Sequence, residues 1–339
     1  MESGATESAI IDIEAVAGTT SSPGYRAQDV ISATGLTKKF GPIEALSGLD
    51  LSVPHNSIVG FLGPNGAGKT TALKLLIGLS RPTSGHATVF GLDAVRESNA
   101  IRARVGYLAQ DPRFYTHLTA RETLEFTARF FFLGSKAAIR RRIDETLELV
   151  GLADKADRPT KGFSGGERQR LGIAQAQVNH PDLLVLDEPA AALDPLGRRD
   201  VLTVMERLRE HTTIFYSTHI LDDVQRVSDH VVILNRGRKV ADAPTSQLLD
   251  GGCTYDLTVR GDAGSAKARL RGQPWVSEVS STVNDGGEHI TVTVTDQEAG
   301  DALLLRTILQ DDSVAVTKFG RKHHNLEEVF LQLVEGQQA

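Results

Sequence analysis

Short, mostly apolar runs that alternate with helix-spaced segments dominate the middle of this chain. Four such runs are present, at residues 57–62, 105–108, 183–186 and 213–216. A strand buried on both faces has this composition, and its alternation with helices predicts a mostly parallel sheet. Residues 30–54 differ, because their apolar positions alternate with turn residues such as Gly41 and Pro42. We expect antiparallel strands there that cover the base of the sheet.

Helical spacing characterises the region between the second and third apolar runs. The helical segments are residues 121–132, 136–150 and 165–178. Thr119 precedes the first segment and Glu122 follows three residues later, which predicts a capping box. The three arginines at 140–142 lie in the second segment. We interpret them as a solvated helix face that is partly paired with Asp144 and Glu145.

After about Gly251 the pattern changes to shorter, more polar elements. The predicted order is strand 254–260, helix 263–270, strands 275–280 and 290–295, helix 299–309 and strand 314–318. This order, βαββαβ, fits a small α+β unit of the ferredoxin-like type. A last amphipathic segment around Leu326 and Phe330 has helical spacing.

Composition adds a third segment to this division. Residues 1–28 are small, polar and rich in Ser, Thr and Gly, and they predict a disordered N-terminal tail. We therefore divide the chain into this tail, a main domain at 29–250 and an accessory domain at 251–339. The length of 339 residues agrees with two folded domains.

Charge, cysteine content and the lengths of the apolar runs argue against several classes of protein. The formal net charge is −6, which argues against binding of nucleic-acid backbones. Cys253 is the only cysteine and predicts neither an intrachain disulfide nor a zinc cluster. No apolar run approaches the ~20 residues that span a bilayer, and the acidic start of the chain is unlike a secretory signal. We expect a cytosolic protein.

The stretch after the first apolar run fits G-x-x-x-x-G-K-[ST] at every fixed position. It consists of Gly63, Pro64, Asn65, Gly66, Ala67, Gly68, Lys69 and Thr70, followed by Thr71. Between a strand and a helix, its backbone N–H groups and the positive helix N-terminus would bind nucleotide phosphates. Lys69 would reach the β- and γ-phosphates, and the Thr70 hydroxyl would contact Mg²⁺.

Two adjacent carboxylates, Asp187 and Glu188, follow the apolar run at 183–186. Their burial would be costly unless a cation lies at the strand end. In a phosphate-loop protein that cation is Mg²⁺. We therefore expect Asp187 to orient the water shell of the metal and Glu188 to polarise the attacking water.

A second set of anion-binding groups opens the helical segment at 165–178. It consists of Ser164, Gly165, Gly166 and Glu167. These backbone N–H groups and the serine hydroxyl lie too far along the chain to belong to the first loop. Two anion sites on one chain predict ATP held between two copies.

With these motifs in this order, the chain resembles the ATP-binding subunits of ABC transporters over about residues 30–249. The resemblance implies a P-loop NTPase core, an antiparallel β subdomain and a helical subdomain at about 111–180. It also implies hydrolysis of ATP with Mg²⁺ and a homodimer that closes around ATP.

The resemblance assigns roles to four more residues. It implies that Phe40 stacks on adenine and that Gln110 links the γ-phosphate and the metal to the helical subdomain. It places Asp194 in the loop that crosses the dimer interface and makes His219 the switch histidine. The implied catalytic residues are Glu188, His219, Gln110 and Lys69, and the implied metal-binding residues are Thr70, Gln110 and Asp187.

One segment departs from the family pattern. Members commonly carry Thr and then Ser or Asn after the Glu-Pro pair, whereas here Pro189 leads into three alanines at 190–192. Hydroxyl contacts across the dimer are therefore absent from this loop, and we expect weaker coupling to the opposite site. The retained Glu188, Asp194 and His219 argue against an inactive paralogue.

The C-terminal extension, with its end at 325–330, resembles that of ATPases serving bacterial multidrug and antibiotic-resistance exporters. This resemblance implies an ATPase that energises a separate membrane permease at the inner face of the cell membrane. The alternatives are a soluble ABC ATPase acting on ribosomes or DNA, and an importer ATPase with a regulatory C-terminal domain. A single cassette, no heptad-rich insertion and an acidic balance favour transport. Nothing in the sequence identifies the cargo.

Residues 111–118 are expected to lie closest to the permease. Phe114 and Tyr115 are candidates for lining the groove that receives it. The alternative is that both aromatic side chains pack inside the helical subdomain.

Overall fold

The computed structural model describes residues 11–12, 29–133, 135–284, 287–310, 314–323, 326–327 and 330. They belong to two compact units. The first comprises Met1–Thr245 with Phe330–Ala339, and the second comprises Ser246–Val329. Within the described ranges, no helix is long and apolar enough to cross a membrane.

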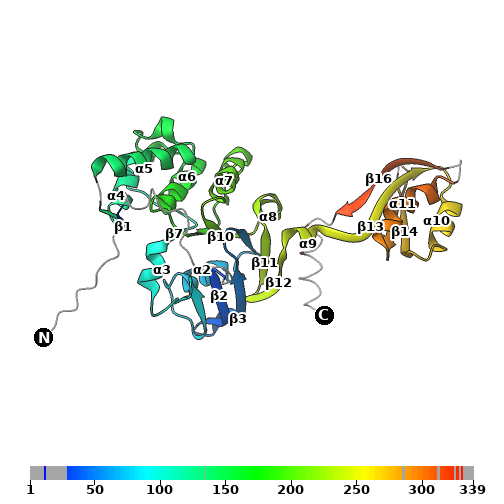
Figure 1. Ribbon diagram of the computed structural model, residues 1–339, viewed down its shortest axis with the longest axis horizontal. Helices are drawn as coiled ribbons and strands as arrows, with labels where there is room; N and C mark the ends of the chain where they lie inside the picture. The colour runs from blue at the N-terminus through cyan, green and yellow to red at the C-terminus, as the bar shows by residue number, and fades with distance from the viewer. Residues whose placement is uncertain are drawn as a thin grey trace. The chain divides into compact units, whose positions relative to one another are not determined.

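A six-stranded sheet forms the centre of the first unit (Figure 1). Its parallel strands are, in spatial order, β11 (His230–Asn235), β4 (Ile58–Leu62), β10 (Thr213–Thr218), β9 (Leu183–Asp187) and β7 (Val105–Leu108). β12 (Arg238–Pro244) pairs antiparallel with β11 at one edge. Every residue of β4, β9 and β10 is buried, which explains their largely apolar composition. The predicted, mostly parallel sheet is confirmed.

Alternate side chains of the buried strands point into two separate cores. In β9, Leu184 belongs to the core formed with α6 (Gly165–Gln177) and α7 (Pro195–Leu208), whereas Leu183 belongs to the core that includes α2 (Lys69–Leu76). This division follows from the two-residue period of a strand. The chain also forms α3 (Ser98–Arg104), α8 (Leu221–Val227) and α9 (Thr245–Leu249).

A second sheet of four antiparallel strands shares the core of α2. Its spatial order is β3 (Ile43–Val53), β2 (Ile31–Phe40), β5 (Ser84–Val89) and β6 (Leu92–Asp93). Buried residues of β2 and β3, among them Ile31 and Leu46, pack in one cluster with Leu73 of α2. The antiparallel strands predicted for residues 30–54 are thus confirmed.

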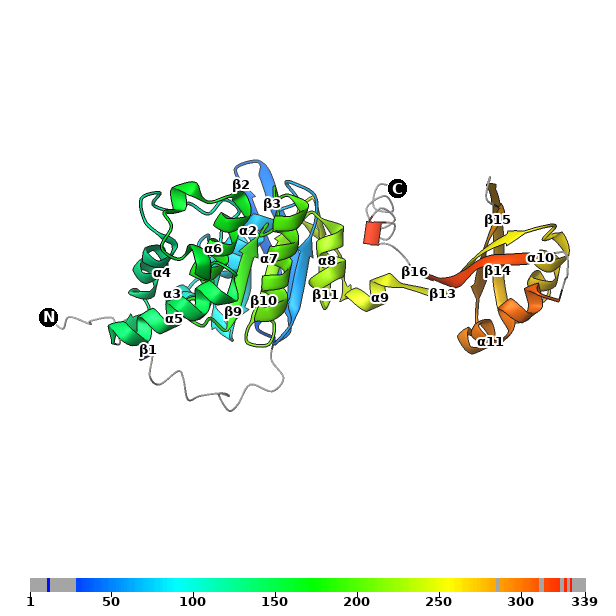
Figure 2. The same ribbon diagram turned by 90° about the horizontal axis from the view of Figure 1, so that it is seen from above.

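The helical subdomain brings α4 (Ala120–Ala128), α5 (Lys136–Leu149) and α6 side by side (Figures 1 and 2). Two 3-10 turns, η1 (Ala153–Lys155) and η2 (Thr160–Gly162), connect α5 to α6. The predicted capping box is present. The Thr119 hydroxyl accepts from the Glu122 N–H at 3.1 Å, and the Glu122 carboxylate accepts from the Thr119 N–H at 2.8 Å.

The first helix of this subdomain ends at Ala128, so the prediction of a helix up to residue 132 is wrong. Phe132–Leu133 instead forms β8, which pairs in parallel with β1 (Ile11–Asp12). The prediction of a disordered tail is therefore wrong for Ile11 and Asp12, and the rest of residues 1–28 lies outside the described residues. Strand pairing with a distant segment does not show in local periodicity.

The arginines at 140–142 do not form one solvated face as predicted. Arg140 and Arg141 are exposed, but Arg142 is only 8% exposed. Its guanidinium donates to the carbonyl oxygens of Val178 and Gln177 at 3.0 and 2.7 Å. Burial lowers the pKa of Arg142 to about 10. Arg142 therefore fastens α5 to the end of α6, and Asp144 pairs with Arg121 outside the cluster.

The second unit contains one four-stranded antiparallel sheet with two helices. Its elements in chain order are β13 (Asp250–Arg260), α10 (Gly264–Arg271), β14 (Val276–Asn284), β15 (Gly287–Val294), α11 (Gln297–Ile308) and β16 (Ala315–His323). The spatial order β14-β15-β13-β16 is that of a ferredoxin-like unit, as predicted. Of the predicted last helix, Leu326, Glu327 and Phe330 are helical, and its other residues lie outside the described residues.

Candidate functional site

The phosphate loop connects β4 to α2 in a conformation that requires glycine. Gly68 is the N-cap of α2 with φ of 105°, and a Cβ there would lie 2.4 Å from the Ala45 carbonyl oxygen. A Cβ on Gly63 would lie 2.3 Å from the Leu234 carbonyl oxygen. Neither distance can be accommodated by a side chain. The loop therefore packs closely on its neighbours at the N-terminus of α2, where the backbone N–H groups of a helix favour an anion.

A cavity of about 320 Å³ opens over this loop. It is lined by Ala45, Pro64, Asn65, Gly66, Ala67, Gly68, Lys69, Thr70, Thr71, Gln110 and Glu188. Gln110 follows β7 and Glu188 follows β9. Because parallel strands end at one edge of the sheet, residues far apart in sequence converge on the loop as predicted.

Lys69 and Glu188 form a buried ion pair in this cavity. The Lys69 ammonium lies 3.1 Å from Glu188 Oε1, and the two side chains are 6% and 5% exposed. It also donates to the carbonyl oxygens of Gly63 and Pro64 at 2.6 and 3.3 Å. Burial of two opposite charges is tolerated because each is paired and hydrogen-bonded.

Asp187 contacts the first turn of α2, the helix that follows the phosphate loop. Its Oδ1 accepts from the Thr70 hydroxyl at 3.1 Å and from the Ser217 hydroxyl at 2.6 Å. Carboxylate and hydroxyl oxygens are ligands that Mg²⁺ prefers, so this donor set fits the predicted metal. Ser217 was not predicted to be a site residue; its position two residues before His219 was the available signal.

Glu188 is held on several sides. His219 Nδ1 lies 2.8 Å from Glu188 Oε2, and the Glu188 N–H donates to the Ser217 hydroxyl at 2.9 Å. The Gln169 amide nitrogen donates to the Glu188 carbonyl at 3.4 Å. Glu188 also has φ of 51°, a conformation that a residue with a side chain adopts only when its surroundings impose it. Gln169, like Ser217, was missed by the sequence analysis.

A different cavity, of about 390 Å³, is lined by the residues at the start of α6, Ser164, Gly165, Gly166 and Glu167, which we call the signature residues. Its lining residues are Ser164, Gly165, Gly166, Glu167, Arg170, Ala192, Leu193, Asp194, Leu196, Gly197 and Asp200. Ser164 and Glu167 form a capping box on α6, and Lys155 lies 3.0 Å from Glu167. Burial would raise the pKa of Glu167, but the hydrogen bond from the Ser164 N–H and then the Lys155 cation lower it below its usual value. The two cavities have no lining residue in common.

Phe40 lies at the end of β2 and is 53% exposed. The Lys38 ammonium lies 4.9 Å from the centre of its ring. A ring with this exposure is available for stacking, and its contact with adenine stays a prediction. In the loop between β9 and α7, Ala192 has φ of 56°, so the alanine segment makes a tight turn before Asp194.

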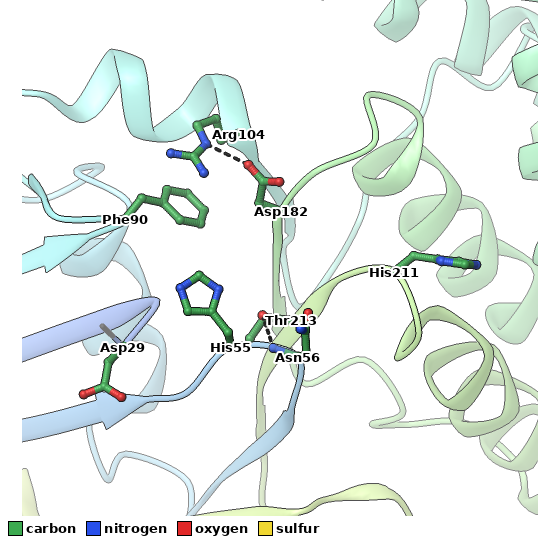
Figure 3. Close-up of a pocket in the computed structure, with 8 residues that line it drawn as sticks. All are labelled: Asp29, His55, Asn56, Phe90, Arg104, Asp182, His211 and Thr213. Carbon is green, nitrogen blue, oxygen red and sulfur yellow. Dashed lines mark hydrogen bonds and ion pairs between the residues drawn. The ribbon is translucent and has the colours of Figure 1, made fainter. Parts of the chain in front are cut away.

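A third cavity, of about 320 Å³, lies at the opposite ends of the strands (Figure 3). Arg104 stacks on the Phe90 ring at 3.9 Å and lies 2.7 Å from Asp182. The Asn56 N–H donates to the Thr213 hydroxyl at 3.0 Å. These polar groups satisfy one another, and this cavity contains none of the predicted site residues.

Residues 46–191 match the family model described as ABC transporter. Over 308 residues the chain is 39% identical to YxlF of Bacillus subtilis, an uncharacterized ABC transporter ATP-binding protein, and the match covers 90% of this chain and 99% of YxlF. The chain belongs to the ABC transporter ATP-binding proteins. It is also 33% identical to the bacitracin transport ATP-binding protein BcrA of Bacillus licheniformis, covering 91% and 98% of the two chains. The daunorubicin resistance ATP-binding protein DrrA3 of Streptomyces coeruleorubidus is 35% identical over 91% of this chain and 96% of its own length.

Solved structures agree with this family. The structure of cbiO1 from Clostridium perfringens, part of the ABC transporter complex cbiONQ, has a TM-score of 0.61 and 26% identity, and covers 66% of this chain and 91% of that chain. The dimeric structure of the bacterial cassette MJ0796 has a TM-score of 0.58 and 27% identity, over 63% and 98% of the two chains. The ABC ATPase fold is thus confirmed, and the chain is an ATP-binding, ATP-hydrolysing subunit of an ABC transporter.

Proposed function

We propose that two copies of this chain close around two ATP molecules and thereby drive export through a separate membrane subunit. The observation that carries the proposal is the presence of two cavities with no shared lining residue, one over the phosphate loop and one at the start of α6. One copy would bind ATP through the phosphate loop, and its partner would cover the γ-phosphate with Ser164 and Gly165. The relatives named for bacitracin transport and daunorubicin resistance support a role in export.

Hydrolysis would use Glu188 and the residues that contact it. Binding of phosphate would transfer the Lys69 ammonium from Glu188 to the β- and γ-phosphates. Glu188 would then accept a hydrogen bond from the attacking water, and His219, at 2.8 Å, would hold the carboxylate in place. Asp194 would reach the site of the partner copy across the dimer.

Mg²⁺ would be held by Thr70, Asp187 and Gln110. The Thr70 hydroxyl and the Asp187 carboxylate lie 3.1 Å apart, so both oxygens can contribute to one coordination sphere. When bound, the ion supplies positive charge that stabilises the phosphate oxygens during transfer. The Ser217 hydroxyl donates to the same Asp187 oxygen at 2.6 Å and would help to orient the carboxylate.

Exposed aromatic side chains on the helical subdomain support docking of a membrane subunit there. Tyr115, Phe126 and Phe130 are 62%, 48% and 67% exposed. Their rings meet edge to face, with centres 6.1 and 5.3 Å apart. An exposed patch of this kind favours a protein partner. Phe114 instead packs against the core, so of the two aromatics singled out in the sequence only Tyr115 is available. Docking there would place the protein at the inner face of the membrane.

The variant Glu188→Gln tests the proposed function. It replaces the carboxylate that would polarise water with a neutral amide but leaves the phosphate loop intact, so ATP hydrolysis should fall by ~10²-fold or more while ATP binding is retained. A dimer that is stable in ATP should appear in size-exclusion chromatography, because closure is no longer followed by hydrolysis.

Glu210→Gln provides the control, since Glu210 is an exposed carboxylate on the same unit. It should hydrolyse ATP as the wild type does. Near-normal turnover by Glu188→Gln would show that another group activates water, and the mechanism above would be wrong.

A further inference from the structure

Two helices of the first unit begin in loops that carry residues of the nucleotide site. α7 begins after Asp194, whose Oδ1 accepts from the Gly197 N–H at 3.2 Å and which lines the signature cavity. α8 begins at Leu221, directly after the loop that contains His219. The two helices pack against each other. A physical route therefore connects the interface loop with the switch histidine.

Arg198 and Asp223 form the closest polar contact along this route. Arg198 lies in the first turn of α7, where its N–H donates to the Asp194 carbonyl at 2.9 Å. Its Nε lies 2.5 Å from Oδ1 of Asp223 on α8, and its Nη2 lies 3.8 Å from Oδ2 of Asp222. The Asp223 side chain is 1% exposed, whereas that of Asp222 is 80% exposed. Arg198 thus makes one buried and one exposed ion pair.

The surroundings of Asp223 leave it one cationic partner among the groups that face it. Burial raises the pKa of Asp223, and the hydrogen bond from Arg198 opposes this effect. The other charged groups that act on it, Asp222 and Glu188, are both acidic. Asp223 also interacts electrostatically with the phenol of Tyr216, which is hydrogen-bonded to Ser228. Separation of Arg198 from Asp223 would leave a buried charge uncompensated, so the pair resists being pulled apart.

We propose that the Arg198–Asp223 ion pair transmits the position of the Asp194 loop to the His219–Glu188 pair. The inference rests on the proposed function, in which this loop meets the nucleotide of the partner copy. When closure moves the start of α7, the ion pair moves α8 with it. His219, in the loop directly before α8, then brings Glu188 into position through their 2.8 Å contact. Neither Arg198 nor Asp223 lines the phosphate-loop cavity, so both are positioning residues.

The alanine segment before Asp194 makes this link more important in this chain. Residues 190–192 carry no hydroxyl group that could contact the opposite site directly. Information about closure must then pass through the backbone of the loop and the helix that follows it. Arg198, held to Asp194 through its backbone and to Asp223 through its side chain, satisfies this requirement.

The test measures steady-state ATP hydrolysis by the purified full-length chain. In Arg198→Gln and in Asp223→Asn, kcat should fall ~10-fold while KM for ATP stays within ~2-fold, because substrate binding does not involve the pair. The matched controls are Arg199→Gln, the exposed neighbour on α7, and Asp222→Asn, the exposed neighbour on α8. Both controls should keep wild-type kcat.

Two further variants separate positioning from loss of fold. The double variant Arg198→Asp with Asp223→Arg restores opposite charges and should recover kcat to within ~3-fold of the wild type. Arg198→Lys keeps the charge but not the planar fork, so its kcat should lie between those of the wild type and Arg198→Gln. Circular dichroism melts establish that each variant is folded at the assay temperature.

The proposal is overturned if folded Arg198→Gln or Asp223→Asn turns over at the wild-type rate, or if the exposed controls lose as much activity. It is also overturned if Arg198→Lys loses kcat and KM together, as a distorted nucleotide site would. Failure of Glu188→Gln to stop hydrolysis would instead contradict the proposed function, and the two failures are therefore distinguishable.

Discussion

At the scale of single residues, the proposed dimer would combine two cavities of the chain that share no lining residue. The phosphate-loop half contains the buried Lys69–Glu188 pair and the Asp187 carboxylate. The signature half offers N–H groups at the start of α6, where Ser164 caps the helix. A γ-phosphate, whose negative charge is spread over its terminal oxygens, could contact both halves at once. Residues at the signature should therefore affect closure more than binding by one copy.

Ser164→Arg tests this division. Its bulk would block the approach of the partner's γ-phosphate, so ATP-dependent dimerisation should be lost while ATP affinity of the single copy stays within ~2-fold. Equilibrium binding of ATP and analytical ultracentrifugation provide the two measurements, in a background carrying Glu188→Gln.

Thr119→Arg is the matched control, because Thr119 closes the same type of capping box on α4. Both variants should lose about 1 kcal/mol of stability with their cap, but Thr119→Arg should still dimerise. Loss of ATP affinity in monomeric Ser164→Arg would place the signature in the same site as Lys69 and refute the two-copy arrangement.

At the scale of elements, the helical subdomain depends on contacts between helices rather than on each helix alone. α6 begins with a capping box at Ser164. At its other end, the Arg142 guanidinium donates hydrogen bonds to the carbonyl oxygens of Gln177 and Val178. The last carbonyl groups of a helix have no hydrogen-bond donor within the helix. Here a cationic side chain of α5 provides the donors. The orientation of the signature therefore depends on α5.

Arg142→Ala should lower the free energy of unfolding by about 2–4 kcal/mol, because it removes two charge-assisted hydrogen bonds and leaves buried carbonyl groups unsatisfied. Arg141→Ala, an exposed change one residue away, should alter stability by less than ~0.5 kcal/mol. Urea unfolding followed by circular dichroism compares them. Equal effects would mean that the buried contacts of Arg142 contribute no more than an exposed arginine does.

At the scale of the whole molecule, the nucleotide residues and the ferredoxin-like sheet belong to different compact units. Every residue assigned to ATP precedes Ile220, whereas the second unit comprises Ser246–Val329. That unit has its own buried cluster, which includes Tyr255, Leu257 and Ile290. A separate core is the usual condition for independent folding.

A chain that ends at Asp250 should therefore bind ATP with a dissociation constant within ~2-fold of the full-length value. Isothermal titration measures the affinity, and Lys69→Ala in the shortened chain should abolish binding as the control. Dimerisation in ATP is measured in parallel, because the accessory domain can contribute to assembly without contributing to the site. A shortened chain that is folded yet fails to bind ATP would show that the domain boundary is misplaced.

The local sequence determined the elements and the identity of the chemistry. A phosphate loop needs glycine where a neighbouring backbone atom leaves no room for a Cβ, as at Gly63 and Gly68. The motif that meets this requirement lies within a few consecutive residues, so the sequence alone reveals it. The same holds for the buried strands and for the caps at Thr119 and Ser164, whose partners lie three residues away. The βαββαβ order of the second unit was likewise visible as alternating local patterns.

Only the tertiary structure decided which distant residues support those motifs. Ser217 reaches Asp187, Gln169 reaches the carbonyl of Glu188, and Arg198 reaches Asp223 across 30, 19 and 25 residues of sequence. A serine, a glutamine or an arginine has no distinctive local pattern, because its hydrogen-bond partner is set by sheet order and helix packing. The burial of Arg142 and the pairing of β1 with β8 escaped prediction for the same reason: both are contacts between segments that only the folded chain brings together.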